Sequence, residues 1–210
     1  HGAETVTYFN NSPDVLTYIW LQLDENEHSS VKNAGYADGS SLSRSFSPTA
    51  IDKLADEKKD NGYGVNILKA TDALGKNLKY TVNKTMMRIN LPKALAPGES
   101  FKFRIKWNYK INDINKDGGR SGLETFPDGN NNYTIAQFFP RLAVYNNVEG
   151  WQNMQFWGRS EWALEFGSYD VKITVPADHI LDATGDLQNE KKVLSKKQRQ
   201  RFEKARKTFD

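Results

Sequence analysis

Residues 100–112 read SFKFRIKWNYKIN, and apolar and polar side chains alternate through this run without a break. The apolar residues occupy every second position and are Phe101, Phe103, Ile105, Trp107, Tyr109 and Ile111. Successive side chains of a β-strand point to opposite faces, so the pattern predicts a strand with one buried face and one solvated, basic face. A chain with such a strand needs a sheet and a hydrophobic layer to cover the apolar side.

Other segments predict further strands. Residues 4–9 form one candidate, and a turn at residues 10–14 separates them from residues 15–23, which are apolar at nearly every position. Residues 78–82 and 87–91 alternate on either side of Asn83-Lys84-Thr85 and predict a hairpin. Tyr169, Val171, Ile173 and Val175 alternate with polar residues before Pro176, which predicts one more strand.

Two segments are typical of helices. Residues 48–60 follow Ser47, a good N-cap, and end before Gly62, whereas residues 195–209 begin at Ser195. Residues 25–47 are rich in Ser, Gly, Asn and Asp and predict a long loop. We therefore expect a mainly β fold, an antiparallel sandwich or saddle-like β domain with one or two short helices. It would occupy residues 1–190, followed by a helical or frayed tail over residues 191–210.

Composition narrows the chemistry. The chain has no cysteine, and its three histidines, His1, His28 and His179, lie far apart in the sequence. We therefore expect no disulfide and no zinc site made by this chain alone. No run of about 18 apolar residues predicts a membrane span, and no signal peptide is visible at the His1-Gly2 start. Periplasmic, secreted and cytoplasmic locations all remain open.

The basic charge is concentrated in the tail. Residues 191–210 contain nine Lys and Arg against Glu203 and Asp210, a net charge of +7, so the first 190 residues carry −4 within the overall +3. A basic helix can bind nucleic acid, but stacking on bases needs interleaved aromatic residues, and the tail offers only Phe202 and Phe209. We expect a solvated connector helix and no nucleic-acid partner.

Residues 113–124 match the calcium-loop pattern D-x-[DN]-x-[DN]-G-x5-E at every specified position. Asp113, Asn115, Asp117 and Glu124 would supply the oxygen ligands. The preceding residues predict a strand rather than the helix of an EF-hand, and the same residue types dominate ordinary turns. A calcium site and a solvated loop between strands are therefore the two interpretations, and the context favours the loop.

Five aromatic residues crowd residues 151–166, namely Trp151, Phe156, Trp157, Trp162 and Phe166. Displayed on a surface, they would form a stacking platform for a carbohydrate or anchors for a protein partner. Aromatic clusters also fill hydrophobic cores, and we favour core packing with an apolar patch against another domain.

Three parts of the chain resemble a known family. They are residues 8–23, residues 78–109, and above all residues 136–189, with Phe166-Gly167-x-Tyr169-Asp170-Val171 leading to Val175-Pro176 and Ala183-Thr184-Gly185. The chain resembles the N-terminal β domain of aminopeptidase N-like (gluzincin) zinc metallopeptidases. The resemblance implies an opening hairpin near residues 8–23 and a β domain that packs on a thermolysin-like catalytic domain and forms one wall of the active-site cleft.

The resemblance also implies a substrate contact. Residues 136–139, Ala-Gln-Phe-Phe, stand where the family holds the free amino group of the peptide. Gln137 matches the family's first glutamine, whereas Phe139 replaces a polar residue that contacts the amine. Asn146-Asn147 stands where an Asp is common, and an amide brings no charge to an ammonium group.

The zinc-binding HExxH motif of this family is absent from the 210 residues. No residue of this chain is therefore expected to be catalytic, and we expect zinc in a catalytic domain downstream in the same polypeptide, with residue 210 a cut within a longer protein. The first hypothesis is a non-catalytic N-terminal domain that forms one wall of the peptide-binding cleft. The alternative is a β-sandwich binding module that uses the aromatic cluster of residues 151–166.

Overall fold

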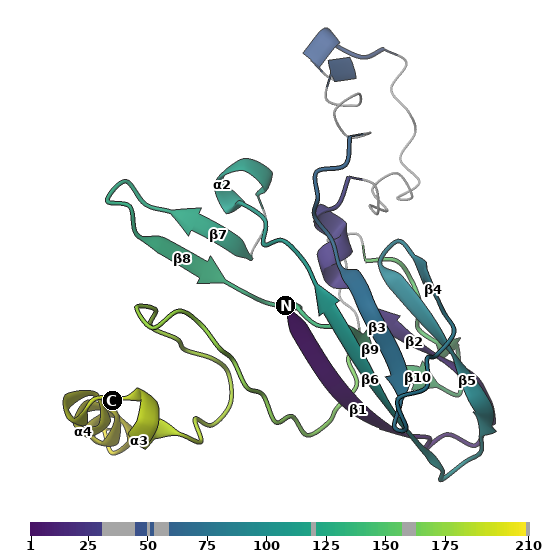
Figure 1. The fold of residues 1–210 in the computed structure, drawn as a ribbon. Coiled ribbons are helices and arrows are strands. Elements are labelled where there is room, and N and C mark those ends of the chain that lie inside the picture. Colours follow the sequence, from purple (N-terminus) through teal and green to yellow (C-terminus); the bar gives the residue numbers. More distant parts are fainter. Residues whose placement is uncertain (31–44, 50, 53–58, 119–120, 157–162, 209–210) are drawn as a thin grey trace. The chain divides into compact units, whose positions relative to one another are not determined.

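The computed structural model of the chain describes residues 1–30, 45–49, 51–52, 59–118, 121–156 and 163–208. The fold is mainly β, as predicted, and its sheets are antiparallel (Figure 1). The chain divides into two compact units, His1–Phe166 and Gly167–Asp210. The sheets belong to the first unit. The domain boundary that the sequence predicts after residue 190 stays a prediction.

One sheet of the first unit is built around the alternating strand. β6 (Ser100–Asn108) lies between β1 (Gly2–Phe9) and β3 (Asn66–Asp72), antiparallel to both. Phe103, Ile105 and Trp107 are buried, whereas the residues between them are exposed or half-buried. The prediction of a strand with one buried face is confirmed, although the strand ends at Asn108, before the last two apolar positions of the pattern.

A second sheet has the order β4-β5-β2-β9. Its strands are β4 (Tyr80–Asn83), β5 (Met86–Leu95), β2 (Leu16–Gln22) and β9 (Arg141–Leu142). The predicted hairpin is confirmed in β4 and β5. Asn83 pairs with Met86, so the turn contains two residues, and Lys84 takes a positive φ of 54°.

The expectation of an opening hairpin near residues 8–23 is wrong. β1 pairs with β6 and β2 pairs with β5, so the two strands lie in different sheets. Asn10 explains the change of sheet, because its fully buried side chain donates hydrogen bonds to the carbonyl oxygens of Asp14 (2.8 Å) and Leu95 (3.0 Å). The end of β1 is thereby held against the β5–β6 connection instead of folding back along itself.

A single hydrophobic core draws on both sheets. Apart from the β6 residues, its fully or nearly fully buried members include Ile19, Leu21, Met87 and Ile89 from β2 and β5. Burying each such side chain contributes roughly 1.5–3 kcal/mol. The period-two pattern of β6 and the apolar run of β2 thus face a shared interior.

Shorter elements extend the first unit. A 3-10 helix, η1 (Asp24–His28), follows β2, and α2 (Ile114–Asp117) precedes the hairpin of β7 (Gly122–Thr125) and β8 (Asn131–Thr134). β10 (Tyr145–Asn146) pairs with β11 (Gly150–Trp151). The start of the predicted loop over residues 25–47 is therefore helical, and its residues 31–44 lie outside the described part.

The helix predicted after Ser47 is described only at its start. Residues 48, 49, 51 and 52 are helical, and the amide of Ile51 donates to the carbonyl oxygen of Ser47 at 3.0 Å. Residues 50 and 53–58 lie outside the described part. With η1, α2 and the tail helices, the described residues contain more short helices than the one or two expected.

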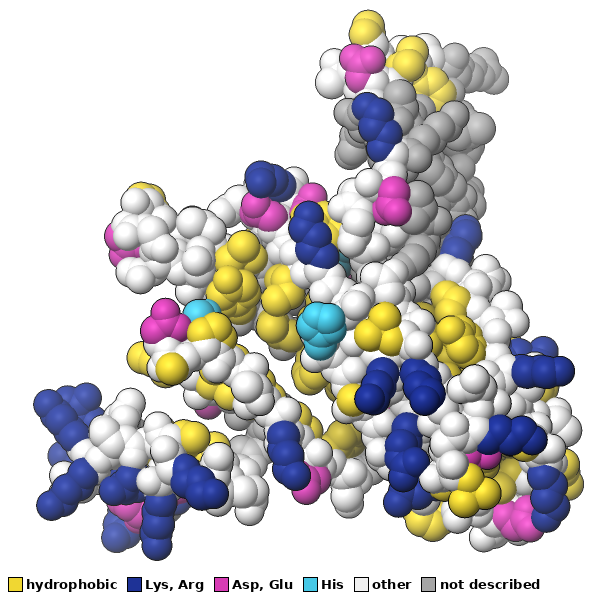
Figure 2. Space-filling model, viewed as in Figure 1, with side chains coloured by type: hydrophobic (Ala, Val, Ile, Leu, Met, Phe, Trp, Pro, Cys, Tyr) yellow, Lys and Arg dark blue, Asp and Glu magenta, His cyan; other side chains and the backbone are white. Residues whose placement is uncertain are grey.

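The second unit ends in α3 (Glu190–Val193) and α4 (Lys196–Arg206). The predicted N-cap is confirmed: Ser195 and Gln198 form a capping box, in which each side chain accepts a hydrogen bond from the other residue's amide, at 3.3 and 2.8 Å. Lys and Arg side chains gather over this segment (Figure 2). No helix among the described residues is long and apolar enough to cross a membrane.

The strand predicted at residues 169–175 is wrong. This segment forms no strand, and Tyr169, Val171, Ile173 and Val175 are all exposed. A strand needs a neighbour for its amide and carbonyl groups, and no described segment pairs with this one. Alternation of apolar residues alone was therefore insufficient to predict a strand here.

Candidate functional site

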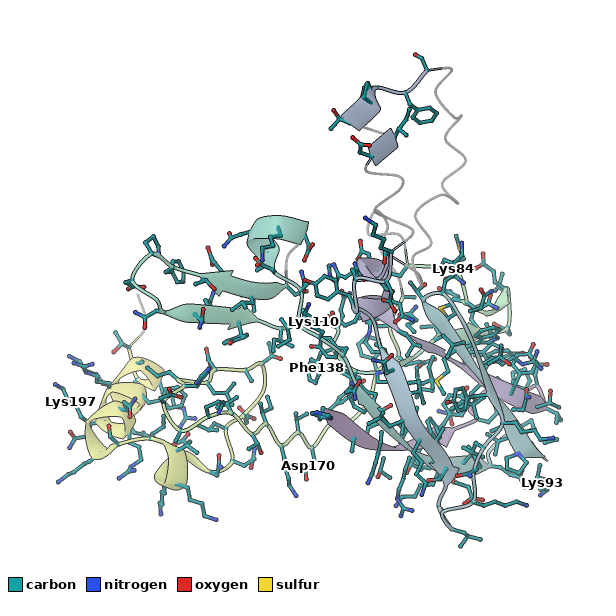
Figure 3. All side chains as sticks on the ribbon, turned by 45° about the horizontal axis from the view of Figure 1, so that its top comes forward. Lys84, Lys93, Lys110, Phe138, Asp170 and Lys197 are labelled. Carbon is teal, nitrogen blue, oxygen red and sulfur yellow. The ribbon has the colours of Figure 1, made fainter. Side chains whose placement is uncertain are left out.

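The loop that carries Gln137 is anchored to β6. The indole Nε1 of Trp107 donates a hydrogen bond of 3.1 Å to the backbone carbonyl oxygen of Phe138. The rings of Phe138 and Phe139 meet edge to face with their centroids 5.3 Å apart, and Phe139 packs against the core. Phe138 lies near the end of β6 that leads into Lys110 (Figure 3). The bond from Trp107 and the packing of Phe139 against the core therefore fix the loop.

Gln137 itself is exposed and takes a positive φ of 54°. For a residue other than glycine this left-handed conformation costs about 1 kcal/mol. The adjoining anchor at Phe138 compensates for that strain and holds the residue with its side chain toward solvent. Such strained, exposed residues are found preferentially at binding sites.

The other two family positions serve the fold. Phe139 is half-buried against the core, so much of its surface is used in packing. The side-chain oxygen of Asn146 accepts hydrogen bonds from the amides of Val148 (3.0 Å) and Glu149 (2.8 Å) in the β10–β11 turn. Gln137 and Asn147 are the compared positions whose side chains stay exposed and accept no hydrogen bond from a described residue, and of the two only Gln137 matches the residue type of the family.

A buried polar cluster holds η1 beside this loop. Asp24 is 3% exposed and accepts hydrogen bonds from Arg141, at 2.7 Å from Nε and 2.6 Å from Nη2. Asn26 is fully buried, donates to the carbonyl of Lys84 at 2.5 Å and accepts from the amide of Val65 at 2.7 Å. These bonds fix η1 against β9, the β4–β5 turn and the residue before β3, and they hold Asp24 and Asn26 in the interior.

Glu25 of η1 lines a crevice next to the Gln137 loop. The other lining residues come from the end of β6 and from the β7–β8 hairpin, and are Tyr109, Ile111, Asn112, Ser121, Gly122, Thr134 and Ile135. Asn112 joins the two sides, because its side chain donates to the carbonyl of Ser121 at 2.9 Å and its carbonyl accepts from the amide of Leu123 at 2.7 Å. Ile135 is two residues before Gln137.

The crevice is acidic in character. Burial, with the charges of Asp24 and Glu27, raises the pKa of Glu25 to about 7. Burial and the charge of Glu25 also raise the pKa of Tyr109. The histidine on the same helix responds in the opposite sense, since burial lowers the pKa of His28. All three shifts disfavour the charged form of the group, as burial predicts.

A second buried carboxyl group lies on β1. Glu4 belongs to the inward row of this strand, with Val6 and Tyr8, and its Oε1 is buried with no hydrogen-bond partner in the described part of the chain. Burial raises the pKa of Glu4 to about 8. Glu4 pairs with Ile105, next to Trp107 on the same face of β6. Two acidic residues thus lie near the anchored loop.

The candidate calcium ligands are engaged in local structure. Asp113 caps α2, accepting from the amide of Asn115 at 3.1 Å, and it forms an ion pair of 3.0 Å with Lys116. Asp117 accepts from the amide of Asp113 at 3.2 Å, and Glu124 lies in β7 opposite Asn132. Within the described residues, no group of three or more His, Asp or Glu could hold a metal ion. Gly119 and Arg120 of the pattern lie outside them.

The described aromatic residues of the cluster at residues 151–166 do not share one surface. Trp151 packs against the core, with its ring centroid 6.0 Å from that of Tyr8 and 5.2 Å from that of Tyr145. Phe156 is half-buried, and Phe166 is fully exposed. Trp157 and Trp162 lie outside the described residues. The alternative of a binding module stays a prediction, although Trp151 serves the core.

Sequence reasoning missed the acidic residues of the site. Glu4 left a signal, because it occupies the apolar phase of a predicted strand at residues 4–9. Glu25 and Asp24 left none, because they stand in a polar stretch that is typical of a loop. Arg141 pairs with Asp24 across more than 100 residues of chain, which no local pattern records.

No family model, no curated protein and no solved structure matches this chain.

Proposed function

We propose that this chain is the non-catalytic N-terminal domain of a zinc aminopeptidase-like protein, in which its two main sheets pack face to face as a sandwich. It would form one wall of a peptide-binding cleft and pack on a downstream catalytic domain of the same polypeptide. That domain would supply the zinc, the general base and the hydrolytic chemistry. This chain would supply the shape of the cleft and a contact for the substrate.

The observation that carries the proposal is the conformation of Gln137. Its exposed side chain projects from a strained backbone position next to the bond between Trp107 and Phe138. Because the backbone of the loop is already held, only the side chain of Gln137 has to be ordered when its amide oxygen accepts a hydrogen bond from an ammonium group. The position coincides with the glutamine of the family resemblance.

The experiment compares the 210-residue chain with the protein encoded by the whole reading frame. An aminoacyl-coumarin substrate should be hydrolysed by the longer protein and left intact by the chain alone. In the longer protein, Gln137→Ala should raise KM on the order of tenfold, the loss expected for one charge-assisted hydrogen bond. Gln188→Ala, at an exposed glutamine of the second unit, should leave KM unchanged.

Three results would overturn the proposal. Hydrolysis by the 210-residue chain would show that it is catalytic. If the whole reading frame encodes no HExxH motif with a further glutamate ligand after it, the longer protein lacks the zinc site that the proposal requires. An unchanged KM in Gln137→Ala would remove the substrate contact.

A further inference from the structure

The outer face of the β1-β6-β3 sheet is basic. The buried apolar residues of β6 alternate with exposed cationic ones, so the cations point to the opposite, solvated face of the sheet. They are Lys102, Arg104 and Lys106. Lys69 of β3 pairs with Lys106 and adds a fourth exposed cation to this face. In Figure 2, Lys and Arg side chains gather over the part of the first unit where β3 and β6 lie.

No acidic side chain balances this face. The neighbours that share it by strand register are small or hydroxylic, namely Ala3, Thr5, Thr7 and Thr71. Lys69, Lys102 and Lys106 form no ion pair with a described residue. Lys69 lies directly opposite Lys106, and like charges in that position repel. The first 166 residues contain 19 Lys and Arg and 19 Asp and Glu, so the basic face is a local concentration of charge.

An exposed leucine stands at the edge of this face. Leu74, in the turn after β3, is 95% exposed. The turn is held tightly, because the Asp72 carboxylate accepts hydrogen bonds from the amides of Leu74 and Lys76, both at 2.9 Å. Arg104, on the basic face, donates from Nη1 to the carbonyl oxygen of Ala73 at 2.8 Å. A fixed backbone therefore displays Leu74 beside the basic face.

A second exposed apolar side chain lies at the same end of β6. Phe9 pairs with Ser100, the first residue of β6, and is 60% exposed. This register puts Phe9 on the same face of the sheet as Lys102. The turn of Leu74 follows the end of β3 that pairs near the start of β6, and β1 and β3 lie on either side of β6. Single exposed apolar residues are ordinary, but these two flank one end of a basic face.

We propose that this face binds the surface of a membrane that contains anionic lipid, with the side chains of Leu74 and Phe9 entering the boundary between headgroups and acyl chains. The lipid phosphates and carboxylates supply the negative charge that the protein face lacks, and the two apolar side chains leave water. Phe138 and the Gln137 loop lie at the other end of β6, so the inference does not rest on the proposed function.

The surface favours lipid over nucleic acid, the other common polyanion. Proteins that bind single strands stack the bases on aromatic side chains along a groove. Phe9 is the one aromatic side chain at the outward positions of β1, β6 and β3, and these strands present a broad face. An exposed leucine gains little beside a phosphate, whereas an acyl chain gives it an apolar environment.

The test uses the 210-residue chain and lipid vesicles. Because the chain has no cysteine, Leu74→Cys can carry a single environment-sensitive dye. Val148→Cys, at an 87% exposed position between β10 and β11, is the matched control. Equimolar phosphatidylserine and phosphatidylcholine should shift the emission of the dye at residue 74 to the blue and leave the dye at residue 148 unchanged. Phosphatidylcholine alone should shift neither, and high salt should reverse the shift.

Charge variants without dye separate the sheet face from the basic tail. Lys102→Gln combined with Lys106→Gln should weaken cosedimentation with the anionic vesicles at least ~10-fold, because each basic residue near such a surface contributes roughly a fivefold factor. Lys197→Gln combined with Arg201→Gln removes the same charge from two exposed positions of α4 and should weaken binding less. Leu74→Ser should weaken binding roughly tenfold or more.

Several results would overturn the membrane surface. They are equal dye shifts at residues 74 and 148, equal binding to vesicles with and without phosphatidylserine, and a larger loss from the α4 variant than from the sheet variant. Binding of a DNA duplex without binding of vesicles would overturn the assignment to lipid. The dye experiment gives a result even where a charge variant fails to fold. None of these readouts involves Gln137 or KM, so the proposed function stands or fails separately.

Discussion

Trp107 on β6 donates its indole hydrogen bond to the backbone carbonyl of Phe138, 31 residues further along the chain, at 3.1 Å. This one bond ties the most regular strand of the fold to the loop that presents Gln137. Trp107 is 4% exposed, so its ring also fills the core. Fold stability and loop geometry therefore depend on the same side chain.

Trp107→Phe should lower the free energy of unfolding by about 1–3 kcal/mol, because it leaves a cavity and removes the donor for a carbonyl oxygen. The amides of Phe138 and Phe139 should also exchange faster with solvent. Trp151→Phe is the control, since it shortens a partly buried indole for which no hydrogen bond is found among the described residues. Equal exchange at residues 138 and 139 in both variants would contradict a specific anchoring role.

Gly122 fixes the β7–β8 hairpin against Asn112, and its replacement should release the hairpin. At this residue φ is 140°, and an added Cβ would lie 2.7 Å from the backbone oxygen of Asn112. Gly122→Ala should therefore speed amide exchange at Leu123, whose amide donates to that oxygen, and destabilise by roughly 1–3 kcal/mol. Gly129→Ala, in the same hairpin with φ of 86° and open space around it, isolates the backbone cost. Similar exchange at Leu123 in the two variants would refute the close-contact explanation.

Features that depend on residues close together in the sequence could be predicted. β6 and the β4–β5 hairpin could be predicted, because period-two burial is written into neighbouring residues. The Ser195 cap could be predicted because its partner, Gln198, is three residues away. Each of these features needs only local information.

Features decided by distant contacts could not be predicted. The change of sheet after β1 depends on Asn10 bonding to Leu95, 85 residues away. Alternation at residues 169–175 says which face would be buried but not whether a partner strand exists. The acidic crevice depends on η1, which Arg141 and Asn26 hold in place. From the sequence alone, the η1 segment is typical of a polar loop. Gln137 was found only through the family resemblance.

Glu4 should make the stability of the chain depend on pH. Burial raises its pKa from 4.5 to about 8, so the folded chain binds a proton more tightly than the unfolded chain. This contribution is full below pH 4.5 and is lost as the pH rises toward about 8. Glu4→Gln should therefore raise stability above pH 8 by about 1–3 kcal/mol and change little in acid.

Thermal unfolding across this pH range measures the effect. The wild-type melting temperature should fall as the pH rises, and the difference between Glu4→Gln and wild type should grow with it. Glu149→Gln, at an exposed residue, should follow the wild-type curve. A constant difference between Glu4→Gln and wild type at all pH values would show that Glu4 does not titrate as described.

Calcium should leave the melting temperature unchanged. The Asp113 carboxylate is paired with Lys116 at 3.0 Å, and Glu124 is fixed in β7, whereas calcium requires about six to eight oxygen ligands. Melting curves in calcium and in chelator, at matched ionic strength, test this expectation. A ligand that binds only the folded chain must raise the melting temperature, so an increase specific to calcium over magnesium would restore the calcium site.

Arg141 and Asp24 form the most buried ion pair among the described residues, with side chains 11% and 2% exposed. Arg141→Met would keep much of the side-chain volume but leave the Asp24 carboxylate buried without its counter-charge. Removing one partner of a buried pair typically costs about 3–5 kcal/mol.

Because Arg141 acts to lower the Asp24 pKa and burial acts to raise it, the variant should have a still higher pKa at Asp24. The folded variant then prefers the protonated acid, so its loss of stability should be largest at neutral pH and shrink as the pH falls and Asp24 takes up a proton. Urea unfolding at neutral and acidic pH measures this change. Lys93→Met, which removes an exposed ion pair of 3.3 Å with Glu99, is the control and should cost less than about 1 kcal/mol. A loss in Arg141→Met that is equally large at both pH values would mean that lost packing, rather than an unpaired charge, destabilises the variant.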